Sequence, residues 1–228
     1  MRQVKLVGAL GAMGVSAAAF AGPDWVEQGD AGAGLTSAQV TSNTFGTLNS
    51  ISGNLTGGRT PDYEDCYLIR IMNPANFSMQ VGSANFNAQL FLFNISVTNG
   101  AFGLLANDDQ SATNNMPRIG NMSNDGTNVI VSLPGLYMIG ITGFNHDPVS
   151  QTGAIFNQAT TTEISGPDGP GGFNPQTGWA GTGETGSYEI FLTGAGPATP
   201  AAGAVGVLGL AGVVGGRRRR RARHVIEM

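Results

Sequence analysis

Residues 66–72 read Cys66-Tyr67-Leu68-Ile69-Arg70-Ile71-Met72, and the side chains at 67, 69 and 71 are large and apolar. This alternation is typical of a half-buried antiparallel β-strand, because successive side chains point to opposite faces of a sheet. Two later segments repeat the pattern, one with Tyr137, Ile139 and Ile141 and the other with Tyr188, Ile190 and Leu192. We therefore expect several strands that each turn one face toward a shared core.

Other short apolar segments of the chain, bounded by Gly, Asn and Pro, are also typical of strands. The 36 glycines disfavour long helices. Seven or eight strands without a persuasive helix predict an all-β fold, an antiparallel β-sandwich of jelly-roll type. The predicted strands span 48–55, 66–72, 77–81, 89–93, 129–133, 136–142 and 187–192, with 102–105 as a candidate eighth.

The N-terminus has the three parts of a secretory signal peptide. Arg2 and Lys5 precede an uncharged apolar run over 6–20, which small residues close. A buried core helix is the alternative, but three glycines in the run weaken it. We expect a signal helix over 1–21, cut by signal peptidase before Gly22, with Ala19 and Ala21 at the positions that this enzyme recognises.

The C-terminus shows a second apolar segment. Pro197 and Pro200 are expected to break the preceding strand, and residues 201–216 contain only Ala, Gly, Val and Leu. As a helix this run would measure about 24 Å, short of the roughly 30 Å hydrocarbon core. The basic cluster over 217–223 would stay on the cytoplasmic side. A nuclear-localisation or nucleic-acid tail is the rival interpretation of the cluster. Its first five arginines are Arg217, Arg218, Arg219, Arg220 and Arg221.

This proline motif, apolar run and arginine cluster resemble the PEP-CTERM type of sorting segment, in the Pro-x-x-Pro form of planctomycete-like bacteria. Ala198 and Thr199 replace the acidic residue of the family's core motif. The resemblance implies that an exosortase-like transpeptidase in the membrane recognises and processes the tail. A permanently inserted single-span anchor is the alternative.

The charge between the two ends is strongly negative. Positions 22–200 hold three arginines and fourteen carboxylates, a net charge of −11. Nucleic-acid binding by this part is not expected, because phosphate contacts need Lys and Arg; cations are the more natural partners. Cys66 is the single cysteine, so no intrachain disulfide can form, and we expect it to be buried and inert.

The chain therefore divides into four parts. They are a signal peptide (1–21), a lead-in (22–44), a β-sandwich (45–196) and a sorting segment (197–228). Within the sandwich, residues 145–180 form a long stretch rich in Gly and Pro, of a length that is often functional or mobile. Its part over 166–172 is expected to be irregular and exposed.

Six segments of the middle of the chain resemble, in order, the bacterial pre-peptidase C-terminal (PPC) domain family. The resemblance covers roughly 45–193 and implies a β-sandwich that accompanies secreted enzymes or stands alone, with members that bind Ca²⁺ and help attachment to polymers. The matching segments are 51–55, 62–71, 89–93, 104–109, 134–141 and 185–190.

Two acidic segments are the candidate calcium ligands. Ca²⁺ takes six to eight oxygen ligands from carboxylates, amides and backbone carbonyls. A turn before one strand and a loop after another, brought together by the sandwich, could supply such a set. The alternative is a solvated acidic turn with Asx-type hydrogen bonds. The candidate ligands are Asp62, Glu64, Asp65, Asn107, Asp108 and Asp109.

Catalytic patterns are poor, so we expect no enzymatic activity. His146 is interpreted as a loop residue, and no Gly-x-Ser-x-Gly pattern occurs. The Gly-x-Gly-x-x-Gly match over 181–186 is followed by a predicted strand, where a dinucleotide site needs a helix.

The sequence thus predicts an exported, surface-associated, non-catalytic protein that binds matrix, polysaccharide or another polymer, with Ca²⁺ as a candidate cofactor. The alternatives are an accessory domain for a secreted hydrolase and, third, a catalytic hydrolase. The expected location is the cell envelope or the extracellular space, with the membrane contacted through the C-terminal helix.

Overall fold

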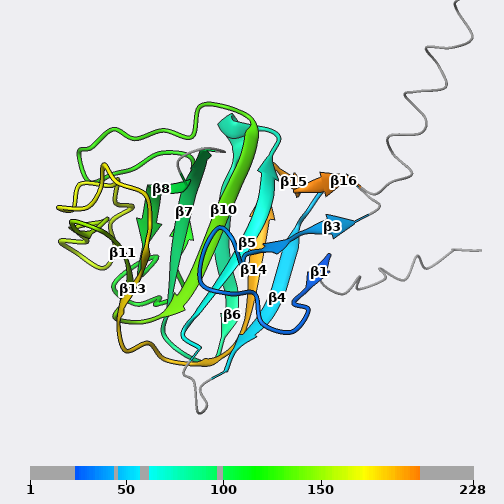
Figure 1. The fold of residues 1–228 in the computed structure, drawn as a ribbon, viewed down its shortest axis with the longest axis horizontal. Coiled ribbons are helices and arrows are strands. Elements are labelled where there is room, and N and C mark those ends of the chain that lie inside the picture. Colours follow the sequence, from blue (N-terminus) through cyan, green and yellow to red (C-terminus); the bar gives the residue numbers. More distant parts are fainter. Residues whose placement is uncertain (1–23, 44–45, 57–61, 97–99, 201–228) are drawn as a thin grey trace, which may run out of the picture.

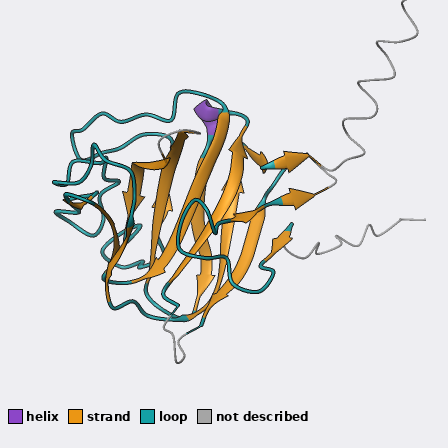
Figure 2. Ribbon diagram, viewed as in Figure 1, coloured by secondary structure: helices purple, strands orange, loops and turns teal. Residues whose placement is uncertain are grey.

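The structure is a computed structural model that describes residues 24–43, 46–56, 62–96 and 100–200. Strands dominate this part of the chain, as Figure 2 shows. Its one helix is a single 3-10 turn, η1 (Pro74–Asn76). The prediction of an all-β fold is confirmed.

Two large sheets carry the fold (Figure 1). Their long strands pair antiparallel, whereas β1 pairs with β4 and β2 with β5 in parallel. The first sheet contains, in spatial order, β1 (Trp25–Val26), β4 (Ser50–Leu55), β14 (Gly186–Thr193), β6 (Ser78–Ala84) and β9 (Arg118–Ile119). The second contains β15 (Ala195–Pro197), β5 (Glu64–Ile71), β10 (Gly135–Gly143), β7 (Ala88–Ser96) and β8 (Gly100–Asn107), with β2 (Gln39–Val40) beside β5.

The main core lies between these sheets. Ile69 and Ile71 of β5 and Ile190 of β14 are buried in one cluster, which also takes side chains from β4, β6, β7 and β10. Burial alternates along β14, where Tyr188, Ile190 and Leu192 are buried while their neighbours are more exposed. The alternation of apolar residues therefore predicted correctly which side chains face the core.

Residues 146–181 cover the outer face of the second sheet, on the left in Figure 1. They contain a small antiparallel sheet of β12 (Gly153–Ala154), β11 (His146–Ser150) and β13 (Gly178–Gly181). Phe91 and Phe93 of β7 pack with Phe156 and Trp179 of this cover in a second apolar cluster. The expectation that 166–172 is exposed is wrong in part, because four of its glycines are buried against neighbouring backbone and side chains.

The expected strand over 129–133 is also wrong. Only Ile130 forms an isolated bridge, with Met122, and backbone hydrogen bonds instead close a loop between 121 and 131. Val131 fills the core from this loop, whereas Leu133 is 69% exposed. The apolar residues of this segment thus include one that fills the core, Val131, but the segment does not pair along its length with a neighbouring strand.

The proline motif does not end the preceding strand. β14 ends at Thr193, and Gly194, with φ of 72°, turns the chain into β15. Pro197 is the last residue of β15 and pairs with Ile69, while β16 (Thr199–Pro200) pairs in parallel with β3 (Ser42–Asn43). The motif is thus part of the folded domain.

The described part of the chain contains no helix long and apolar enough to cross a membrane. The expected signal peptide with its cleavage site, the apolar run over 201–216 and the arginine cluster lie outside the described residues.

Candidate cation site

Asp65 occupies the first core-facing position of β5. It shares a face with Tyr67, Ile69 and Ile71, and the alternation that buries those side chains also buries this carboxylate completely. Its Oδ2 atom accepts a hydrogen bond of 2.5 Å from the Tyr188 hydroxyl. Its Oδ1 atom is buried and has no hydrogen-bond partner among the described residues.

The N-terminal lead-in brings a second carboxylate to this point. The backbone N–H of Cys66 donates to the Gly32 carbonyl at 3.0 Å, which holds the lead-in against the start of β5. The N–H of Gly32 in turn donates to Asp30 Oδ1 at 2.7 Å. Glu27 braces the same turn by accepting hydrogen bonds from the N–H groups of Ala31 and Asn54.

Asp30, Asp62 and Asp65, here called the carboxylate triad, each place an oxygen within 4.8 Å of the other two. Ca²⁺ binds oxygens at about 2.3–2.6 Å, so ligand oxygens on one ion lie no further apart than about 5 Å. The spacing of the triad is therefore compatible with a single calcium ion.

The electrostatics of the triad favour a bound cation. Burial raises the pKa of Asp65 to about 8, and the charges of Glu27, Asp62 and Asp30 add to the shift against the opposing Tyr188 hydrogen bond. The pKa of Asp62 is also raised, by burial first and then by Asp30. The groups whose charges act on Asp65 are all carboxylates, so their ionised forms repel one another without a counterion.

Glu64, a predicted ligand, does not join the triad. It points to the other face of β5, where its Oε2 lies 2.7 Å from Nε2 of His146. The other ring nitrogen of His146 is 2.9 Å from the Gly181 carbonyl oxygen, and the ring stacks on Trp179 at 6.0 Å between centroids. The interpretation of His146 as a loop residue is wrong: this side chain is buried in β11 and fastens the cover to β5.

The second predicted acidic segment lies elsewhere. Asn107 is in register with Leu90, Leu90 with Ile141, and Ile141 with Asp65, so two strands separate Asn107 from Asp65. Three strand spacings correspond to about 14 Å. The Asn107 side chain is also engaged, since it donates to the carbonyls of Asp109 and Glu163 and accepts from the N–H of Arg118. The structure therefore does not bring Asp62 and Asp65 together with Asn107, Asp108 and Asp109.

Sequence reasoning missed Asp30, although a signal for it existed. Glu27 and Asp30 give the lead-in two carboxylates within four residues, a local excess in a chain with few charged side chains. Nothing local indicated that this segment would lie beside β5.

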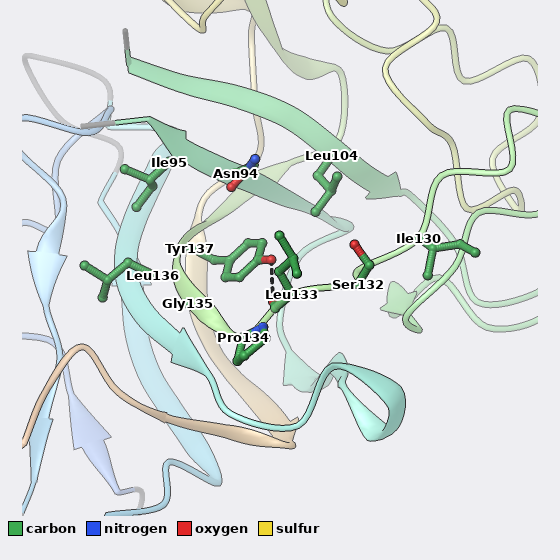
Figure 3. A pocket seen from close by; sticks show the side chains of 10 residues that line it. All are labelled: Asn94, Ile95, Leu104, Ile130, Ser132, Leu133, Pro134, Gly135, Leu136 and Tyr137. Atoms are coloured by element: carbon green, nitrogen blue, oxygen red, sulfur yellow. Dashed lines mark hydrogen bonds between the residues drawn. The ribbon is translucent and has the colours of Figure 1, made fainter. Parts of the chain in front are cut away.

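Cys66 and a surface hollow beside β7 and β8 are two further places where chemistry could occur. Cys66 is buried as expected, and burial raises its thiol pKa, which disfavours a nucleophilic thiolate. A hollow of about 290 Å³ lies between the 130–137 segment and strands β7 and β8 (Figure 3). Its one titratable side chain, Tyr137, donates its hydroxyl to the Leu133 carbonyl at 2.7 Å, which leaves no free acid or base there.

These residues define an all-β protein of two packed sheets with a candidate cation site at the end of the core. No protein-family model matches the chain, and no curated protein matches it.

Proposed function

We propose that this chain is an exported, surface-associated, non-catalytic binding protein whose attachment to an extracellular polymer depends on Ca²⁺ at the carboxylate triad. The observation that carries the proposal is the meeting of three carboxylates within 4.8 Å, with one buried Asp65 oxygen unpartnered among the described residues. Buried polar groups normally have a hydrogen-bond partner or bind an ion, so a ligand is expected at this Asp65 oxygen.

Calcium at this position would also join two parts of the fold. Asp30 belongs to the lead-in, whereas Asp65 belongs to β5. An ion shared by both would fix the lead-in on the sheet and set the shape of the surface around it. Binding of the cation and presentation of that surface would then be coupled.

The proposal extends to the type of sandwich. The order β4-β14-β6-β9 in one sheet and β5-β10-β7-β8 in the other supports a jelly roll, in which successive strands mostly alternate between the sheets and one pair, here β7 and β8, forms a hairpin within a sheet. The resemblance to PPC domains supports the same architecture and a role in attachment. Export rests on the charge and hydropathy pattern of the two ends of the sequence.

The test uses the full chain, freed of metal with EGTA, in a co-sedimentation assay with insoluble cellulose, chitin and bacterial cell-wall material. We expect retention on at least one polymer with Ca²⁺ present and its loss in EGTA or in the Asp62→Asn variant. Glu189→Gln is the matched control, because this carboxylate lies outside the triad on β14. Equal retention with and without Ca²⁺ would reject the calcium dependence, and no retention on any polymer would reject the binding role.

A further inference from the structure

A second group of carboxylates lies across the second sheet from the triad, at the end of β8. Asp108 and Asp109 directly follow β8, and Asp147 belongs to β11 of the cover. Asp108 is only 3% exposed, and its Oδ1 atom has no hydrogen-bond partner in the described ranges. The Oδ1 atom of Asp109 is buried and unpartnered in the same sense.

The strand register explains why Asp108 lies near the start of β11. Asn107 pairs with Leu90, so Asp108 lies beside Gln89 on the neighbouring strand. The Gln89 amide donates to Asp147 Oδ1 at 3.2 Å, and its carbonyl oxygen accepts from the N–H of His146 at 3.3 Å. Gln89 therefore holds the start of β11, and Asp147 with it, over the row that Asp108 occupies.

Charges around Asp108 have one sign. Burial raises the pKa of Asp108 to about 7, and the charges of Asp109 and Asp147 raise it further. In the described part of the chain the one ion pair joins His146 to Glu64, so no arginine there neutralises these carboxylates. Two buried, unpartnered carboxylate oxygens in such a group are unfavourable unless a cation or a proton compensates them.

We propose that Asp108, Asp109 and Asp147 hold a second divalent cation, independent of the carboxylate triad. The class of ligand is a hard, oxygen-preferring ion of the Ca²⁺ type, because the side chains of this group offer carboxylate oxygens. These three carboxylates are spread more widely than the triad, whose oxygens all lie within 4.8 Å. The ion therefore keeps several of its waters, and at least one carboxylate contacts it through them.

The site would link β8 to the cover, just as the first site would link the lead-in to β5. Asp109 already donates its N–H to the Thr161 carbonyl at 2.7 Å, so the ion would reinforce an existing contact between the two segments. The competing account is a proton on Asp108 in place of a metal.

The experiment counts bound Ca²⁺ on the full chain by native mass spectrometry and isothermal titration calorimetry after EDTA treatment. We expect two ions on the natural protein, one on Asp108→Asn, one on Asp62→Asn and none on the double variant. Asp147→Asn is a second variant of the same site and is expected to match Asp108→Asn. Glu189→Gln, on the first sheet, should retain both ions.

The outcomes separate the two sites. A single ion on the natural protein that only Asp62→Asn removes would overturn this inference and leave the proposed function standing. A single ion that only Asp108→Asn or Asp147→Asn removes would support it and reject the triad. No bound ion at all would reject both. Circular dichroism and thermal unfolding of each variant show whether a lost ion reflects a lost fold.

Discussion

Tyr188 of β14 donates a hydrogen bond of 2.5 Å to Asp65 of β5, across the core that separates the two sheets. The residues are 123 positions apart in the chain. Tyr67 extends the contact, since its hydroxyl oxygen lies 2.5 Å from that of Tyr188. This hydrogen-bonded chain through the core ends at the candidate cation site, so occupancy of the site and stability of the fold should be coupled.

The Asp65→Asn variant tests this coupling through pH. The pKa of Asp65 is raised from its ordinary 3.8 to about 8, so the folded protein favours the protonated form. The metal-free protein should lose stability as pH rises between these two values, because the unfolded chain releases the proton more readily. Asn has no proton to release, and the variant should keep a higher melting temperature at about pH 8.

Calorimetric or fluorescence melting curves in EGTA, recorded from about pH 5 to about pH 8, measure this slope. Added Ca²⁺ should raise the melting temperature of the natural protein at the alkaline end by more than that of Asp65→Asn, which lacks an intact triad. Identical slopes for the two proteins would contradict the burial of a protonated Asp65.

The Tyr188→Phe variant tests the hydrogen bond itself. It removes the donor to Asp65 Oδ2 and the partner of the Tyr67 hydroxyl, which leaves buried polar atoms unsatisfied. We expect the free energy of unfolding to fall by about 1–3 kcal/mol in urea titrations. Tyr137→Phe is the control, because its hydroxyl bonds to the Leu133 carbonyl in a partly buried position, and it should lose about 0.5–1.5 kcal/mol. An equal loss in both variants would speak against a special role for the buried chain.

The His146→Gln variant tests how the cover is fastened. Burial lowers the pKa of His146, but the Glu64 hydrogen bond, the Gly181 carbonyl and the charges of Glu64 and Asp147 outweigh it, so the pKa is raised above 6.5. A raised histidine pKa contributes stability that is fully present below 6.5 and is lost as pH rises through the raised value.

We therefore expect His146→Gln to reduce the free energy of unfolding by roughly 1–3 kcal/mol at about pH 5.5, with the difference shrinking toward about pH 8.5. The comparison is made in an Asp65→Asn background, because Asp65 changes stability with pH in the same direction. A difference that stays constant with pH would show that the charge on His146 does not contribute.

The Gly172→Ala variant tests whether the glycine-rich part of the cover is tightly packed. A Cβ atom at Gly172 would collide with the Pro167 carbonyl oxygen, which is backbone and cannot move aside cheaply. We expect a loss of about 1–3 kcal/mol and faster hydrogen exchange in the cover. Gly120→Ala is the control, because no atom lies within 4 Å of its added Cβ. Unchanged exchange in Gly172→Ala would mean that this segment adapts freely.

Much of the fold could be predicted because strand periodicity is a local property. Tyr67, Ile69 and Ile71 alternate along one short segment, which predicts that they share a face of the strand. All three are buried in the structure. Asp62 and Asp65 are three positions apart, so their proximity at the start of β5 could also be predicted from the local sequence. The failure at 129–133 shows the limit of this reasoning, because an apolar pattern cannot show whether a partner strand is present.

The all-β class, the core-facing residues of the long strands and two of the three triad residues could be inferred from the sequence alone, since they depend on neighbours along the chain. Long-range folding, by contrast, places Asp30 beside Asp65, pairs Glu64 with His146 82 positions away, and leaves two strands between Asn107 and Asp65. These outcomes depend on strand order and register, which arise from contacts between segments far apart in the chain and leave no mark on the residues nearby.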